Sequence, residues 1–147
     1  MDFLSNFVDC LNDYLATNEI SASAFCKTAG ISVSGLLAVL AGKAEPSLAT
    51  VIKCADAMHC SADYLLGLAD SPEYTPTSAA ASFPERLFAL LRTRGVTQYR
   101  LAADCGLEQS VISKWKRGKL PKPETLILLS EYLRCSADWL LGRSDLT

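Results

Sequence analysis

The sequence predicts an all-α protein made of two tandem five-helix units joined by a short linker. The first reason is an internal repeat, because CSADYLLG at residues 60–67 returns as CSADWLLG at residues 135–142. The second is that apolar residues recur at helical spacing, between residues suited to begin and end helices. The third is a stretch of prolines and small polar residues at 71–82 that separates the two copies. A repeat of this length is typical of a small domain that is used twice.

The repeat extends upstream of these eight residues through most of each unit. Equivalent residues lie 76 positions apart in the first part of the units and 75 apart in the last part. The sequence therefore divides into a first unit at 1–70, a linker at 71–82 and a second unit at 83–147. A unit of this size buries only about 60% of the surface of its unfolded chain, so each core is small but sufficient. The matched pairs include Phe7 with Phe83, Leu11 with Leu87, Gly30 with Gly106, Gly42 with Gly118, Pro46 with Pro121 and Thr50 with Thr125.

In the first unit, apolar residues from Phe3 to Leu15 recur at helical spacing and predict the first helix. A second helix is expected to run to about residue 28, where Gly30 supplies a turn, and a third to about residue 41, where Gly42 ends it. A fourth helix follows, and a short fifth one ends at Gly67. Pro46 and Ser47 open the fourth helix. The second, third and fifth helices are each preceded by a serine suited to cap them: Ser21, Ser32 and Ser61.

The second unit repeats this scheme. Its first helix is expected from about residue 84 to residue 93, and its second begins at Thr97. Gly106 makes the next turn, and the third helix runs from about residue 108 to residue 117. Pro123 suits the first position of the fourth helix, and Ser136 is placed like Ser61 before the last one.

Charge is distributed unevenly between the units. The whole chain has a formal net charge of −2, but residues 1–70 hold eight acidic and three basic residues, a net charge of −5. Residues 83–147 hold seven acidic and eleven basic residues, a net charge of +4. A polyanion such as double-stranded DNA is expected to favour the second unit and to be repelled by the first.

The third helix of the second unit has two different faces. At about 100° per residue, its polar and cationic side chains fall within an arc of about 140°. Leu107, Ile112 and Trp115 point away from the centre of that arc and are expected to contact the core. A helix of this kind fits the major groove of DNA, with its N-terminal end nearest the bases. The outward-facing residues are Gln109, Ser110, Ser113, Lys114 and Arg117.

Residues 97–119 carry the pattern T-Q-x-x-L-A, a turn glycine, and then x-I-S-x-W-x-x-G-K. This pattern resembles the Cro/C1-type (XRE) helix-turn-helix family, the phage repressors and their bacterial relatives. The resemblance covers residues 83–145 and implies the lambda-repressor-like fold for both units. It implies that Gln109, Ser110 and Lys114 contact base edges, with Ser113 on the same face. It further implies that Gln98, Arg117 and Lys119 contact backbone phosphates.

A less specific interpretation remains open for this face, because Gln, Ser and Lys on an exposed helix are usually only solvated. The order of the motifs and the +4 charge of the unit favour DNA binding instead. Four further arginines either extend a basic surface or keep the unit soluble, and we do not assign them to DNA. They are Arg86, Arg92, Arg94 and Arg100.

The first unit resembles the same family but lacks the polar face. The residues equivalent to 109, 110, 113, 114 and 117 are Val33, Ser34, Leu37, Ala38 and Ala41, and Ala22 stands in place of Gln98. Val33, Leu37 and Leu40 form a candidate apolar patch for a protein contact. We favour an interaction or dimerisation role for this unit over weak DNA contact. A third interpretation is a decayed duplicate that contributes only bulk.

The function expected from these observations is a sequence-specific transcriptional regulator, a repressor that occludes a promoter and acts as a homodimer. The alternative is a protein-interaction module, such as an antirepressor or antitoxin-like adaptor. An enzyme is not expected, because the sequence has no G-x-S-x-G motif, no phosphate-binding glycine loop and no set of metal ligands.

Neither a cofactor, nor a metal ion, nor a small-molecule effector is expected. The six cysteines form no C-x-x-C pair and are interpreted as buried free thiols. The cluster of Cys54, His59 and Cys60 is the sole metal-site candidate and lacks further ligands. The N-terminus has no targeting pattern and the chain has no run of about 20 apolar residues. We therefore expect a cytoplasmic protein.

Overall fold

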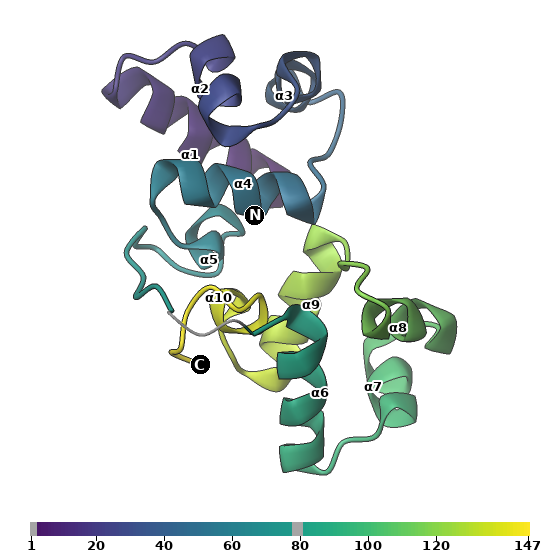
Figure 1. Ribbon diagram of the computed structural model, residues 1–147. Helices are drawn as coiled ribbons and strands as arrows, with labels where there is room; N and C mark the ends of the chain where they lie inside the picture. Colours follow the sequence, from purple (N-terminus) through teal and green to yellow (C-terminus); the bar gives the residue numbers. More distant parts are fainter. Residues whose placement is uncertain (1–2, 78–80) are drawn as a thin grey trace. The chain divides into compact units, whose positions relative to one another are not determined.

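A computed structural model describes residues 3–77 and 81–147, in which the chain forms ten α-helices (Figure 1). The chain divides into two units between Tyr74 and Thr75. The all-α class and the five helices in each unit, both predicted from the sequence, are confirmed. Unit 1 contains α1 (Phe3–Thr17), α2 (Ala22–Ala29), α3 (Val33–Leu40), α4 (Leu48–Met58) and α5 (Ala62–Leu65). Unit 2 contains α6 (Phe83–Arg94), α7 (Gln98–Cys105), α8 (Gln109–Lys116), α9 (Pro123–Leu133) and α10 (Ala137–Leu140).

Side-chain caps begin the helices where the sequence predicted them. In unit 1 the hydroxyl of Ser21 accepts a hydrogen bond from the backbone N–H of Ala24 at 3.1 Å, and that of Ser32 accepts one from Gly35 at 3.2 Å. In unit 2 Thr97 and Ser136 do the same, at 3.1 and 2.9 Å. These bonds satisfy donors that a helix leaves unpaired at its N-terminus, so each helix starts at a defined residue.

Each unit has its own apolar core, and the two cores use equivalent residues. Leu11 of α1 and Leu65 of α5 are fully buried in unit 1, and their counterparts Leu87 and Leu140 are fully buried in unit 2. Within unit 1, α1 packs on α5 and α4 packs on both α2 and α5. Within unit 2, α10 packs on α6 and α9, and α8 packs on α6 and α7. The two helices of the helix-turn-helix pack on each other in both units, α2 on α3 and α7 on α8, and the first of them packs on the fourth helix of its unit, α2 on α4 and α7 on α9. The repeat therefore preserves the packing that positions the helix-turn-helix.

The cysteines contribute to these cores as free thiols. Five of the six are buried, as predicted, and Cys105 at the end of α7 is half-buried. Burial, together with the neighbouring thiols, raises the pKa of Cys54 to about 12. Among the described residues, no cluster of His, Cys, Asp and Glu is arranged to hold a metal ion. None of the helices in the same part of the chain has the length and apolar character to span a bilayer.

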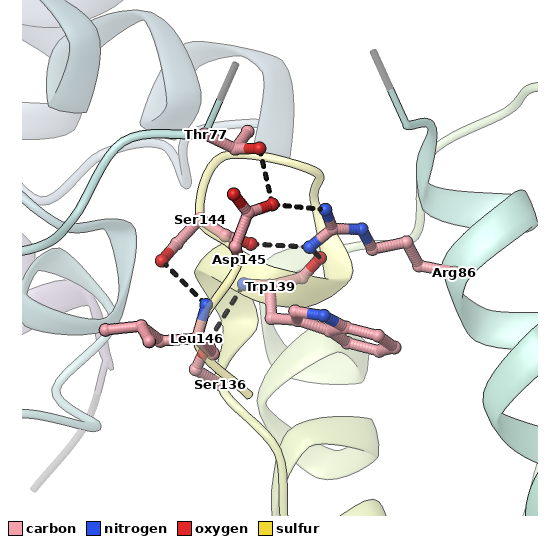
Figure 2. A network of polar contacts seen from close by, with 7 residues as sticks. All are labelled: Thr77, Arg86, Ser136, Trp139, Ser144, Asp145 and Leu146. Carbon is pink, nitrogen blue, oxygen red and sulfur yellow. Dashed lines mark hydrogen bonds and ion pairs between the residues drawn. The ribbon is translucent and has the colours of Figure 1, made fainter. Parts of the chain in front are cut away.

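The C-terminal segment of unit 2 is fastened to the start of that unit (Figure 2). The guanidinium of Arg86 donates to the carbonyls of Trp139 and Ser144, at 2.9 and 2.5 Å, and pairs with Asp145 at 3.2 Å. The hydroxyl of Thr77 donates to the same carboxylate at 2.5 Å, and this bond and those from Arg86 hold the pKa of Asp145 below its usual value. Residues upstream of α6 thus belong to the folded unit.

Both ends of the stretch predicted as a linker contact the unit beside them. The carbonyl of Pro72 accepts a hydrogen bond from the backbone N–H of Ser61 in unit 1, at 2.8 Å. The backbone N–H of Thr77 donates to the carbonyl of Arg143 in unit 2, at 3.0 Å, beside a bridge between Pro76 and Ser144. The part of the predicted linker at residues 78–80 lies outside the described residues.

Gly142 is expected to be the glycine of unit 2 that is least tolerant of a side chain. Its φ is +75°, and a Cβ there would lie 2.0 Å from the carbonyl oxygen of Ala81. Gly106 also has a positive φ of +65°, but a Cβ there would meet nothing within 4 Å. We expect Gly106→Ala to destabilise unit 2 by about 1 kcal/mol through its backbone alone. Gly142→Ala should cost about 1–3 kcal/mol more because of the overlap.

Urea unfolding followed by tryptophan fluorescence measures this difference, because both tryptophans of the chain, Trp115 and Trp139, lie in unit 2. Equal midpoints for the two variants would contradict the close approach of Ala81 to Gly142.

Candidate nucleic-acid interface

The third helix of unit 2, α8, is held on the unit by two buried apolar side chains. Ile112 and Trp115 are 0% and 1% exposed. The Trp115 ring meets the ring of Phe83 edge to face, with 5.7 Å between centroids. Gly106, with a φ of +65°, makes the turn from α7 into α8. The expectation that Ile112 and Trp115 contact the core is therefore confirmed.

The opposite face of α8 is polar and accessible. Gln109, Ser110 and Lys114 are exposed, and Ser113 between them is half-buried. The helix is one residue shorter at each end than the sequence suggested, because Glu108 is the N-cap and Arg117 the C-cap. Arg117 is exposed just after the last turn, and so is Lys119 beyond Gly118, while Gln98 at the start of α7 is half-buried. One of the seven predicted contact residues, Gln98, thus begins α7, and the other six lie on α8 or just after its last turn.

Three of these residues are joined by hydrogen bonds. The Nε2 of Gln98 donates to the Oε1 of Gln109 at 3.2 Å and to the Oγ of Ser113 at 3.4 Å. The helix-turn-helix brings these residues together although they are 11 and 15 positions apart in the sequence. The sequence predicted that Gln98 contacts a phosphate, but it did not predict that Gln98 also orients Gln109. A signal for this was available, since Gln98 and Gln109 each occupy the first position of their helix.

A carboxylate also lies beside the polar face. Glu108 makes no side-chain cap for α8, and its Oε2 accepts a hydrogen bond from the hydroxyl of Ser110 at 3.4 Å. Glu108 was not among the residues predicted for the site. A carboxylate in the major groove accepts from the amino group of cytosine and repels phosphate, so it can contribute to sequence preference. Its position directly before a predicted base-contacting glutamine is the signal that could have identified it.

Three of the four arginines that were not assigned to DNA have partners within unit 2. Arg86 is part of the C-terminal network and its side chain is only 10% exposed. Arg94 donates to the carbonyl of Leu133. Arg100 pairs with Asp104 at 3.4 Å on the surface of α7. Lys116 lies over the ring of Phe88 at 5.0 Å, which directs its charge toward α6 rather than toward the polar face of α8.

The equivalent helix of unit 1, α3, has an apolar outer face. Val33 and Leu37 are 39% and 50% exposed, whereas Leu40, the third residue of the candidate patch, is half-buried. Leu36 and Val39 hold the helix on the core. The hydroxyl of Ser34 is hydrogen-bonded to that of Ser32 at 3.1 Å. The two units thus present the same helix with different chemistry on its outer face.

Comparison with protein families gives two matches to one family model, described as helix-turn-helix. The matches cover residues 13–65 and 87–140, which is more than half of the chain and includes α2, α3, α7 and α8. Comparison with curated proteins and with solved structures gives no match.

Neighbouring residues on the two faces of α8 are expected to differ sharply in their effect on stability. Trp115→Ala removes a buried ring and should destabilise unit 2 by about 3–5 kcal/mol. Lys114→Ala removes an exposed side chain and should change stability by no more than about 0.5 kcal/mol. Urea unfolding followed by Trp139 fluorescence and by circular dichroism provides the measurement. A large loss of stability from Lys114→Ala would mean that this lysine serves the fold and not a surface contact.

Proposed function

The chain belongs to the Cro/C1-type helix-turn-helix family of DNA-binding regulators, and we propose that its second unit recognises a specific duplex sequence with α8 in the major groove. The observation that carries this proposal is the two-faced character of α8. Ile112 and Trp115 fix the helix on the core, and an accessible polar and cationic face lies opposite them. The net charge of +4 on residues 83–147 favours approach to a polyanion.

We assign the base contacts to the outward face of α8. Gln109 suits a bidentate contact with adenine and Lys114 suits guanine, and each good contact discriminates by about 1–3 kcal/mol. Ser110 and Ser113 supply hydroxyls that serve as donor or acceptor. Because Gln98 already holds the amide of Gln109 at 3.2 Å, the glutamine is oriented before DNA arrives.

We assign the phosphate contacts to residues around α7 and α8. Arg117 and Lys119 follow the last turn of α8 and are exposed, so their charges can meet the backbone on one side of the groove. Gln98 at the first turn of α7 meets the backbone on the other side, where the N-terminal amides of that helix also favour an anion. Contacts of this kind set the register of a protein on DNA without specifying its sequence.

The regulator is proposed to be a repressor that acts by occluding a promoter, as a homodimer on a palindromic site. One module of this size buries only about 600–1,000 Å² of protein surface on DNA, which favours a paired arrangement. Unit 1 is proposed to contact protein rather than DNA. Its helix α3 presents Val33 and Leu37 where unit 2 presents Gln109 and Ser113, and residues 1–70 carry a net charge of −5.

In vitro selection from a random duplex pool, with the full chain at near-physiological salt, tests the proposed function directly. We expect enrichment of one motif with two-fold symmetry, because α8 of two chains would read equivalent half-sites. Two unlike half-sites would show that both units recognise DNA. Failure to enrich any motif, together with binding that fades as salt rises, would reject the sequence-specific regulator. That outcome would favour the antirepressor or adaptor alternative.

Two exposed lysines are expected to have separable effects on DNA binding. Lys114→Ala should relax base preference at one position of the site and cost about 1–3 kcal/mol on the cognate duplex. Lys119→Ala should weaken cognate and random duplexes alike and lower the dependence of log K on log salt by about 1. Fluorescence anisotropy on both duplexes over a range of salt concentrations measures these effects. Identical behaviour of the two variants would contradict the division between base and phosphate contacts.

A further inference from the structure

Unit 1 contains a pocket that takes no part in the DNA contacts proposed for unit 2. Its volume is about 360 Å³, which lies within the range of small-ligand sites. Its lining is mainly apolar and comes from α1, from the end of α4, from α5 and from the segment that follows unit 1's last helix. The lining includes the side chains of Cys10, Asp13, Tyr14, Asn18, Tyr64 and Glu73.

The internal repeat shows what occupies the same place in unit 2. Cys10 is equivalent to Arg86, and Tyr64 is equivalent to Trp139. In unit 2 the guanidinium of Arg86 lies 5.0 Å from the centre of the Trp139 ring and donates to two backbone carbonyls and to Asp145 (Figure 2). An aromatic face, carbonyls and a carboxylate thus surround a planar cation there.

A second arginine is also replaced in unit 1. Asn18 is equivalent to Arg94, which in unit 2 donates across to the carbonyl of Leu133 on α9. The amide of Asn18 instead donates to the carbonyl of Tyr14 on its own helix, at 2.9 Å. Two long cationic side chains that cross unit 2 are therefore replaced in unit 1 by two short ones, Cys10 and Asn18, and both of these line the pocket.

The carbonyl of Tyr64, equivalent to that of Trp139, already accepts a hydrogen bond from the amide of Asn6 at 3.0 Å. The equivalent of Asp145, Asp70, does not line the pocket.

The pocket nevertheless offers aromatic faces and two other carboxylates. The rings of Tyr14 and Tyr64 both line it, and so do the carboxylates of Asp13 and Glu73. Within the described residues, neither carboxylate has an ion-pair partner. Burial raises the pKa of Cys10, while its hydrogen bond with Tyr64 opposes that shift and is the main cause of the raised pKa of Tyr64. The charge of Asp13 is a minor contributor to both pKa shifts, and the charge of Asp9 contributes only to that of Cys10.

We propose that the pocket of unit 1 binds an alkylguanidinium group beside Cys10 and Tyr64, which are the equivalents of Arg86 and Trp139 in unit 2. The planar cation stacks on the tyrosine rings and pairs with Asp13 and Glu73, while its alkyl chain lies along the apolar wall. The group can come from a free small molecule or from an arginine side chain of another protein. The net charge of −5 on residues 1–70 favours either source. This binding does not depend on DNA recognition by unit 2.

Titration of the isotopically labelled full chain with argininamide, followed by amide NMR shifts at low salt, tests the proposal. We expect saturable shifts confined to residues around the pocket, with a Kd on the order of 1 mM. Lysinamide carries the same charges without a planar group and should bind several-fold more weakly. Absence of saturable shifts, or equal binding of the two amides, would overturn the assignment of the pocket to a guanidinium group.

Variants locate the binding. Cys10→Arg should supply the missing guanidinium from the chain itself and abolish argininamide binding. Asp13→Asn should weaken binding about fivefold. Asp9→Asn is the matched control, because it makes the same charge change on the same helix but does not line the pocket. Each variant is first checked for an undisturbed amide spectrum. If Cys10→Arg fails to fold, the comparison of Asp13→Asn with Asp9→Asn decides, and equal effects of these two would reject the site.

A capped peptide with one arginine between glycines distinguishes the sources of the group. Binding at least as tight as that of argininamide identifies a protein side chain as an acceptable ligand. If the peptide binds more weakly than argininamide, and argininamide still gives saturable shifts, the ligand is identified as a free small molecule.

Discussion

The burial of Trp115 and Ile112 under α8 is the constraint on which the candidate interface depends. These two side chains fix the rotation of the helix about its own axis, and that rotation decides which residues face outward. A helix of eight residues has little stability of its own, so its geometry comes from this apolar contact. The polar face can therefore vary freely in sequence without loss of the fold. The two units illustrate this, because α3 and α8 share their buried face and differ in almost every outward residue.

Duplication followed by divergence explains how one chain holds two units of opposite charge. The turn glycines and several core leucines are kept, because each satisfies a backbone or packing requirement that both units share. The side-chain caps are kept only in part, because Ser32 and Ser47 of unit 1 correspond to Glu108 and Lys122, which make no side-chain cap in unit 2. Surface positions carry no such requirement. Unit 1 has no polar face on its third helix and no equivalent of the two arginines that cross unit 2. Without these arginines, unit 1 has a pocket beside Tyr64. In unit 2 the side chain of Arg86 lies over the equivalent ring, that of Trp139.

The sequence was sufficient to predict the helices, their caps and the buried position of Trp115, because these depend on residues close together along the chain. It also indicated which side chains of α8 face outward, since helical periodicity alone decides this. It did not reveal the bond between Gln98 and Gln109, the burial of Arg86 or the pocket beside Cys10. Each of these depends on side chains that meet only after the helices have packed. The partner of Arg86, for example, is a carboxylate 59 positions further along the chain.

The hydrogen bonds from Gln98 to Gln109 and Ser113 have a consequence for how the specificity of such a regulator can change. The three side chains form one connected group, so the effect of replacing any one of them depends on the other two. Energies of residues that share a network are not additive. Under the proposed contact of Gln109 with a base, a change of preferred base at that position is therefore expected to depend on the residues at positions 98 and 113. Lys114 has no part in this network and can change alone, so the path to a new operator is expected to begin there.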